Sequence, residues 1–319
     1  KTVGFKLEGA VLDPGSAGGE QYIGGVQVPI SVKRSYTNIL PSLHVNYNFS
    51  EDLKGRVSYS TGLSRPSYIE ARASASISEL FTSVGGGNPN LKQEESWGID
   101  AALEWYFDEA SILSLTVFYR EIDNVISSSI EKVLGSVYSD TAVPGELWDL
   151  SSFGNGKDGE LKGIELAFTG RLDNYIGGFV SGFGIEGSVA FIESEYTSPS
   201  GFKFSLPGQS DTNYNLSLFY ENYGFTARLT YRYRNRWLDE TETGDVFGLD
   251  AGVYWDTQDR LDLALRYNLE QLTGYQAAIF VDVNNLTDAV DLRYSGEKWN
   301  PNQSESYGRR YVAGVRWSF

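Results

Sequence analysis

The sequence predicts an all-β protein, a transmembrane antiparallel β-barrel, and three observations support this prediction. Apolar and polar residues alternate in about twelve segments, each close to the ~10 residues that a tilted strand needs to cross a bilayer. Short and long connections alternate between these segments. The composition, with 35 Gly, 21 Tyr, 17 Phe and 7 Trp among 319 residues, suits many strands joined by polar loops.

The alternation is clearest in residues 40–49 (LPSLHVNYNF) and 95–107 (ESWGIDAALEWYF). In the first, Leu43 and Val45 point to one face of a strand while His44 points to the other. Aromatic residues gather towards the ends of the second, as membrane interfaces favour. The other ten predicted strands are residues 3–11, 55–63, 112–120, 163–168, 183–191, 213–220, 225–237, 260–267, 275–283 and 311–319.

The connections between these segments are of two kinds. The short ones are SED, DEA, ENYG and LEQLTG, with DNYIGGFVSG as the longest of the set. The long ones are residues 13–36, 65–94, 128–159, 197–206, 238–256 and 286–305. Outer-membrane barrels have short periplasmic turns and longer extracellular loops. We therefore expect the long connections outside the cell and the last strand to run towards the periplasm.

Residues 225–237 (FTARLTYRYRNRW) place four arginines on one face of a predicted strand and mainly apolar and aromatic residues on the other. The formal net charge of −16 would repel a phosphate backbone, so nucleic acid is not an expected partner. In a membrane barrel the apolar face meets lipid and the arginines line the interior, as a solvated or salt-bridged wall or as contacts for a plug or ligand. The residues expected to face the interior are His44, Arg228, Arg232, Arg234, Arg236 and Asp262, the last as a partner for one arginine.

Several stretches, in their order and spacing, resemble the C-terminal barrel region of TonB-dependent receptors. They are YTNILPSLHVNYNFSEDLKGRVSYSTGLSRPSY, GGGNPNLKQEESWGIDAALEWYF, LKGIELAF, LPGQSDTNYNLSLFYE, VDVNNLTD and GRRYVAGVRWSF. The resemblance implies a Gram-negative outer-membrane protein whose complete form has 22 strands around an N-terminal plug. Residues 1–319 then correspond to barrel alone, about the C-terminal half, with no plug visible and Lys1 in mid-barrel.

The resemblance also implies function and partners. The expected function is capture of a scarce nutrient at the extracellular loops and its import with energy from a TonB-type coupling protein that acts through the missing plug. Further expected partners are outer-membrane lipid, the remaining strands of the parent chain and the barrel-assembly machinery. The C-terminal strand supplies the assembly signal, with Tyr311, Val315, Trp317 and Phe319.

Ligand contacts are expected from the long loops, and no cofactor is expected. The candidates are Trp148, Tyr254, Trp255 and Trp299, whose rings suit stacking against a sugar or other polar ligand, or else pack the loops themselves. Acidic loops favour carbohydrates, peptides and cationic or neutral complexes over a strongly anionic ferric chelate. The sequence does not identify the ligand.

Other functions stay open at this point. A complete twelve-stranded barrel would act as a passive channel. An outer-membrane hydrolase could use His44, the only histidine, as a base beside Ser42. The LDETETGD loop offers Asp239, Glu240, Glu242 and Asp245, but it lacks the spacing of a calcium loop and no metal site is expected.

Overall fold

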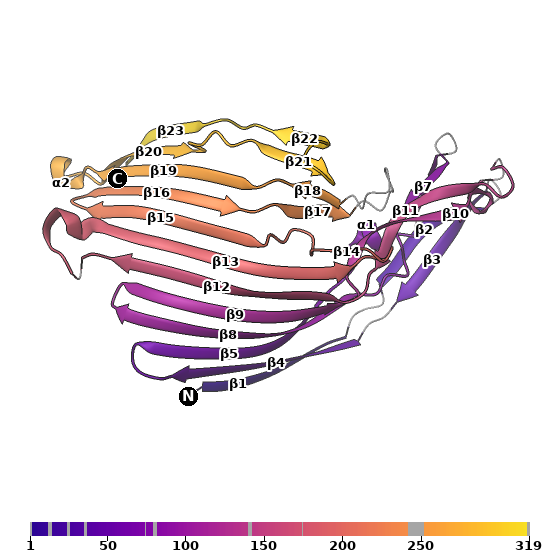
Figure 1. Ribbon diagram of the computed structural model, residues 1–319, viewed down its shortest axis with the longest axis horizontal. Helices are drawn as coiled ribbons and strands as arrows, with labels where there is room; N and C mark the ends of the chain where they lie inside the picture. Colours follow the sequence, from indigo (N-terminus) through magenta and orange to yellow (C-terminus); the bar gives the residue numbers. More distant parts are fainter. Residues whose placement is uncertain are drawn as a thin grey trace.

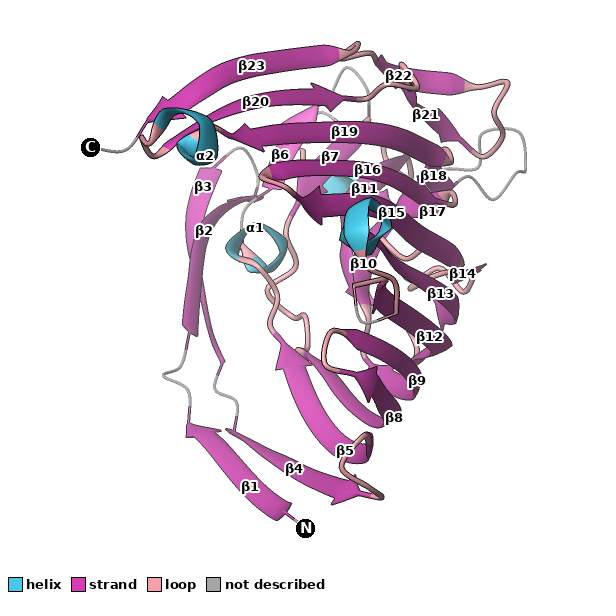
Figure 2. Ribbon diagram, turned by 90° about the vertical axis from the view of Figure 1, so that its left-hand side faces the viewer, coloured by secondary structure: helices cyan, strands magenta, loops and turns pink. Residues whose placement is uncertain are grey.

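The protein is dominated by one large antiparallel sheet that curves around an open interior (Figures 1 and 2). The computed structural model describes residues 2–11, 15–23, 26–34, 37–73, 75–78, 82–139, 142–173, 175–241 and 252–317, the first three ranges as backbone only. No helix in these ranges is long and apolar enough to cross a membrane.

Twelve strands of this sheet follow one another in chain order, which confirms the twelve predicted segments. They are β1 (Thr2–Val11), β4 (Thr37–Asn48), β5 (Leu53–Ser64), β8 (Glu94–Asp108), β9 (Ser111–Asp123), β12 (Gly159–Arg171), β13 (Phe183–Thr197), β15 (Thr212–Asn222), β16 (Phe225–Arg234), β19 (Gln258–Asn268), β20 (Ala277–Asn284) and β23 (Arg310–Trp317). A short strand, β14 (Lys203–Phe204), adds to β13. In the described part of the chain β1 pairs with β4 and β23 with β20, and no ladder joins β1 to β23, so the sheet is an open arc (Figure 2).

Short turns lie together at one end of the sheet, on the left in Figure 1. The tightest, Tyr223 and Gly224, has φ of 52° and 75°, and two positive φ angles match the twist of a two-residue hairpin. Two longer turns contain the 3-10 helix η2 (Gly178–Gly182) and the helix α2 (Glu270–Thr273). β20 begins at this end, shortly after α2, and β23 pairs with it antiparallel. The last strand therefore ends at the end of the sheet where the short turns lie, as expected.

Long connections lie at the opposite end, and they form sheets of their own, which the sequence did not predict (Figure 1). One four-stranded sheet contains β10 (Ile126–Leu134), β11 (Leu147–Asn155), β7 (Ser83–Gly86) and β6 (Ala75–Ser78). A second contains β17 (Trp237–Thr241), β18 (Gly252–Trp255), β21 (Asp291–Ser295) and β22 (Pro301–Glu305). A hairpin of β2 (Gly15–Ile23) and β3 (Val26–Arg34), the helix α1 (Tyr68–Ala71) and the 3-10 helix η1 (Gly135–Val137) complete this end.

The strand register gathers apolar side chains on one face of the large sheet. Val57, Ala101, Val117, Ile164 and Phe191 are successive partners across five strands, which places them in one row. The four larger side chains of this row are 42–57% exposed although they are apolar. Such an apolar outer band is what a bilayer requires of a barrel.

Aromatic rings border this apolar band at both ends. Towards the short turns, the ring of Phe107 lies 5.4 Å from that of Trp105 and 6.0 Å from that of Phe168. Towards the loops, the ring of Trp97 lies 6.4 Å from Tyr59 and 5.7 Å from Tyr119. Trp97 and Trp105 lie eight positions apart, roughly 26 Å along the strand, which for a strand tilted by about 40° is a height of roughly 20 Å, somewhat less than the ~25 Å of a membrane band.

The polar face carries three large rings that lie against the sheet. Phe118, Phe219 and Phe280 are each paired directly with a glycine, Gly163, Gly184 and Gly314 respectively. A Cβ atom at these glycines would lie 2.6, 2.2 and 2.7 Å from the facing ring. Only glycine leaves room for the ring at this distance.

Candidate functional site

Charged side chains on the polar face of the sheet form cross-strand pairs. Arg228 donates to Glu186 at 2.8 Å, and Arg120 donates to Asp100 at 3.0 Å. Arg232 pairs with Asp262, the residue that the sequence offered as an arginine partner. The arginine strand therefore presents its guanidinium groups on the face opposite Leu229.

A hollow of the polar face lies beside these arginines and has a volume of about 480 Å³. Arg232, Arg234 and Arg260 line it together with the carboxamides of Asn213, Asn215 and Gln258. Arg232 and Arg260 are direct partners in the register of β16 and β19, so two cations stand side by side. The one carboxylate in the lining is that of Glu165. This hollow can accept an anionic or strongly hydrogen-bonding group.

Arg234 and Arg236 are held differently from the other two arginines of the strand. The guanidinium of Arg234 lies 3.6 Å from the ring centroid of Trp237 and donates to Ser210 at 2.9 Å. The strand ends at Arg234, three residues before the end of the segment predicted for it. Arg236 therefore lies in the link to β17, 5.2 Å from the ring centroid of Tyr254.

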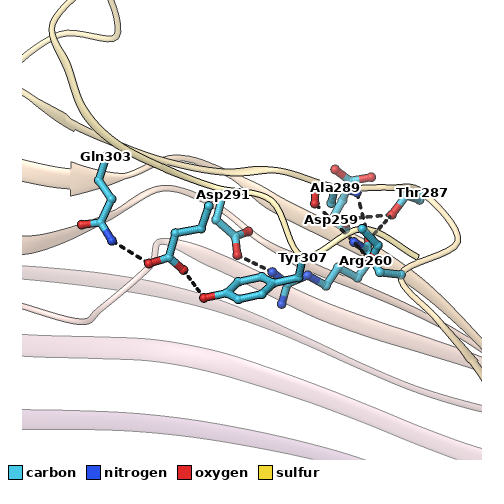
Figure 3. A network of polar contacts seen from close by, with 10 residues as sticks. Asp259, Arg260, Thr287, Ala289, Asp291, Gln303 and Tyr307 are labelled. Atoms are coloured by element: carbon cyan, nitrogen blue, oxygen red, sulfur yellow. Dashed lines mark hydrogen bonds and ion pairs between the residues drawn. The ribbon is translucent and has the colours of Figure 1, made fainter. Parts of the chain in front are cut away.

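A polar network fixes the connection between β20 and β23 beside the hollow (Figure 3). Asn285, with φ of 58°, accepts from the backbone N–H of Ala289 at 2.9 Å and donates its own N–H to Asp262 at 2.8 Å. Asp291 pairs with Arg260. The same network orients Asp262, which pairs with Arg232, and Arg260, which lines the hollow.

Further along the connection, Glu305 accepts from Gln303 and from the hydroxyl of Tyr307, both at 2.6 Å (Figure 3). The carboxylate of Glu305 raises the pKa of the Tyr307 phenol because its acceptor oxygen and its charge both favour the protonated form.

The four aromatic ligand candidates do not come together in one place. Trp148 is 1% exposed, and its indole donates to Glu146 at 3.0 Å inside the first loop sheet. Tyr254 and Trp255 stack on Tyr294 and Trp237 at 6.0 and 6.3 Å within the second loop sheet. Trp299 is 72% exposed in the link between β21 and β22. Of the four, Trp299 offers the most ring surface to a ligand.

A second recess of about 380 Å³ lies in the first loop sheet, and the sequence did not point to it. Tyr138, Phe153, Glu131 and Asn88 are among its lining residues. Burial and the negative charge of Glu131 raise the pKa of the Tyr138 phenol, which stays protonated as a hydrogen-bond donor. No spacing rule could have found this recess, because its lining comes from separate loops.

The two loop sheets meet over a small core. The hydroxyl of Ser128 donates to the carbonyl of Thr241 at 2.6 Å across the seam. Below it, a buried cluster fills the junction between the loops and the large sheet, and its members are Val125, Tyr196, Phe204 and Leu238. The long loops are thus packed against one another rather than independent.

The remaining candidates are placed as follows. His44 is exposed on the polar face and makes no hydrogen bond or ion pair within the described ranges. Arg293 pairs with Asp239 at 2.7 Å and with Glu240 at 3.3 Å, while Glu242 and Asp245 lie outside the described residues. Across the described residues, no group of three or more histidine or acidic side chains is arranged to hold a metal ion.

The residues of the expected assembly signal lie on the last strand. Tyr311, Val315 and Trp317 share the apolar face of β23 and are 66%, 64% and 55% exposed. Phe319 lies outside the described residues.

Several solved structures have a similar fold. The ferric enterobactin receptor of Pseudomonas aeruginosa is 16% identical, with a TM-score of 0.61 over 89% of this chain and 40% of that one. The ferric-catecholate import receptor Fiu of Escherichia coli K12 is 14% identical, with a TM-score of 0.61 over 92% of this chain and 37% of that one. The FrpB iron transporter of Neisseria meningitidis is 14% identical, with a TM-score of 0.59 over 89% and 40%.

The chain thus spans about 40% of the length of the receptors that it matches. No curated protein sequence matches it. The sequence profile of the family described as "TonB dependent receptor-like, beta-barrel" matches residues 9–286, which is most of the chain. The protein therefore belongs to the TonB-dependent receptors, a family of outer-membrane transporters, and these residues are part of the receptor β-barrel.

Proposed function

We propose that this chain is part of a receptor that binds a scarce nutrient at its extracellular loops and imports it by TonB-dependent active transport. The observation that carries the proposal is the arginine-lined hollow on the polar face of a sheet whose other face is apolar. A transporter needs a hydrated, ligand-compatible interior inside a wall that tolerates lipid. Arg228, Arg232, Arg234 and Asp262 line that interior, and His44 and Arg236 contribute to it nearer its edges.

The ligand class is proposed from the chemistry of the hollow together with the relatives. The matched receptors are named for ferric enterobactin, ferric catecholates and iron. Of the three arginines in the lining of the hollow, Arg232 pairs with Asp262 and Arg260 with Asp291, whereas Arg234 has no carboxylate partner among the described residues. Together with the carboxamides of the lining, these guanidinium groups favour a ligand rich in hydrogen-bonding oxygens, such as an iron chelate. As the acidic loops also indicate, this ligand does not need a strong negative charge. Trp299 and the recess beside Tyr138 are proposed as first contacts at the loops.

The partners follow from the same proposal. Ten further strands and a plug in the parent chain would close the open arc, and a TonB-type protein would act through that plug. The barrel-assembly machinery would recognise the exposed apolar face of β23. A passive channel would instead need β1 and β23 to pair, and the part of the chain that the structure describes contains no such ladder.

The test is uptake of a labelled iron chelate by cells that express the intact receptor. We expect the double change Arg232→Gln and Arg260→Gln to weaken binding by about tenfold or more, since each charged hydrogen bond is worth about 1.5–3 kcal/mol. Arg56→Gln is the matched control, because Arg56 pairs with Glu104 on the same face but away from the hollow. Uptake that persists after the proton gradient is collapsed would instead support a passive channel.

A further inference from the structure

The turn between β12 and β13 differs in chemistry from the other turns at its end of the sheet. The others carry carboxylates at or beside their tips: Glu51, Asp52, Glu109, Glu221 and Glu270. The one carboxylate between β12 and β13, that of Asp173, lies at the start of the turn and pairs with Arg171 at 3.2 Å. Residues 175–182 (YIGGFVSG) contain no charge and are mainly apolar or glycine. A water-exposed turn gains nothing from such a composition, so the residues of this turn require another environment.

The turn does not extend away from the sheet but folds back over its apolar face. The ring of Phe179 lies 4.9 Å from that of Tyr220, and Phe183 and Tyr220 are direct partners in the register with rings also 4.9 Å apart. Tyr220 shares its face with Leu216 and Leu218 and is 5% exposed under these rings. The turn therefore covers the outer side of the wall, not the interior.

Local contacts hold the turn in this position. Gly182 packs so closely that a Cβ atom there would lie 2.7 Å from the ring of Tyr220. Asn222 donates to the hydroxyl of Ser181 at 3.0 Å, and that hydroxyl donates to the carbonyl of Gly178 at 2.7 Å. Gly178 itself has φ of 75°, which an L-residue rarely adopts. The folded-back position is thus built by specific residues.

The surface that the turn presents outwards is apolar. Phe179 is 63% exposed, Ile176 48%, Val180 43% and Phe183 43%. On one side, the hydroxyl of Tyr175 donates to Asp108 at 2.8 Å, which anchors the turn beside the aromatic border at Trp105 and Phe107. The patch therefore continues the lipid-facing band at its periplasmic edge.

We propose that residues 175–183 form a membrane-interface foot that rests in the periplasmic leaflet of the outer membrane. The patch is continuous with the lipid-facing surface of the barrel, and aromatic and aliphatic side chains of this kind partition to the headgroup boundary. The foot has no charge that would specify a protein partner. A phospholipid leaflet is the occupant that matches both its chemistry and its position. The foot would fix the depth of this side of the barrel.

These 319 residues contain no cysteine, so a single cysteine can be introduced into them for site-directed spin labelling in the intact receptor, with any cysteine elsewhere in the parent chain replaced by serine. Val180→Cys and, as the matched control in the neighbouring turn, Glu109→Cys are labelled with a nitroxide after reconstitution into phospholipid bilayers. Collision rates are then measured with oxygen, which concentrates in lipid, and with a water-soluble nickel complex. Both positions are exposed, so either label is tolerated by the fold.

The expected result is a ratio of oxygen to nickel accessibility severalfold higher at residue 180 than at residue 109. Equal ratios at the two positions would place the foot in water and overturn the proposal. Protection of residue 180 from both reagents would mean that protein covers the patch, which also overturns it. As a second measurement, Phe179→Ser should reduce the oxygen-to-nickel ratio at residue 180, whereas Tyr223→Ser should leave it unchanged.

Discussion

The large sheet and the loop sheets are both antiparallel in most of their pairs, yet they expose opposite kinds of side chain. Val57 and Ile164 of the large sheet are half exposed, whereas Leu238 and Trp148 of the loop sheets are 0% and 1% exposed. The first arrangement suits lipid, which tolerates apolar surface, and the second suits water, which does not. Apolar side chains are therefore exposed on the outer face of the large sheet and buried in the loop sheets, and an aromatic border lies between the two regions.

The largest expected effect comes from removing a buried ring from the core of the first loop sheet. Trp148→Ala should destabilise the first loop sheet by about 3–5 kcal/mol, because it removes a fully buried ring. The large sheet should stay folded, since its stability in lipid does not depend on this core. Limited proteolysis should then cut residues 126–155 while the barrel keeps its heat-dependent mobility on gels. Trp299→Ala is the control and should change neither.

A charge on the lipid side of the large sheet should have the next largest effect. Leu229→Arg near the bilayer midplane is expected to cost roughly 2–4 kcal/mol. Thr230→Arg, on the polar face, should cost about 1 kcal/mol from the lost hydrogen bond to Ser217 at 2.9 Å. Urea unfolding of the receptor in lipid measures both. Equal losses at the two sites would contradict the assignment of the two faces.

A smaller effect should follow from replacing a glycine of the polar face whose Cβ position is occupied by a neighbouring ring. Gly184→Ala is expected to cost about 1–3 kcal/mol, because its Cβ would lie 2.2 Å from the ring of Phe219. Replacing Phe219 with Leu in the same chain should recover part of that loss. Gly177→Ala is the control, since no atom lies within 4 Å of a Cβ there. Urea midpoints in lipid report all three.

The smallest effect concerns an exposed ion pair of the loops. Lys298 lies 2.6 Å from Asp256, and this hydrogen bond raises the pKa of the Lys298 ammonium. The stabilisation is therefore present below the ordinary lysine pKa and is lost as the pH rises above the raised value. Because the Lys298 side chain is 60% exposed, Lys298→Met should cost less than about 1 kcal/mol at pH 7. The rates of loop proteolysis for the variant and the parent should differ at pH 7 and converge as the pH rises above the raised pKa of Lys298.

The comparison also explains how much of the structure could be predicted from the sequence. Alternation in residues such as Leu43, His44 and Val45 predicted the strands and the two faces of the large sheet. In a membrane barrel the apolar residues of each strand face lipid and the residues between them face the interior. The same logic predicted that Asp262 pairs with one of the arginines, and that arginine is Arg232. The end of the arginine strand at Arg234 was missed, because Arg236 continues the alternation beyond the last ladder bond.

The loop sheets could not be found in this way. Their strands are short, and β7 pairs with β11 in parallel through Val84 and Leu150, residues that lie 66 positions apart. Such contacts depend on where the large sheet holds the loop ends, not on local pattern. For the same reason, the burial of Trp148 and the recess beside Tyr138 carry no signal in the sequence.

The paired phenylalanines and glycines have a consequence for anything that moves past the polar face. Each ring occupies the space that a side chain at the facing glycine would need, so one side chain covers two positions of the wall. Phe118 and Phe280 remain partly exposed, whereas Phe219 is 5% exposed beneath the guanidinium groups of Arg171 and Arg228, which lie 5.7 and 5.0 Å from its ring centroid. At Phe219 the surface of the wall is therefore cationic rather than aromatic, because the ring lies beneath the guanidinium groups that cover it.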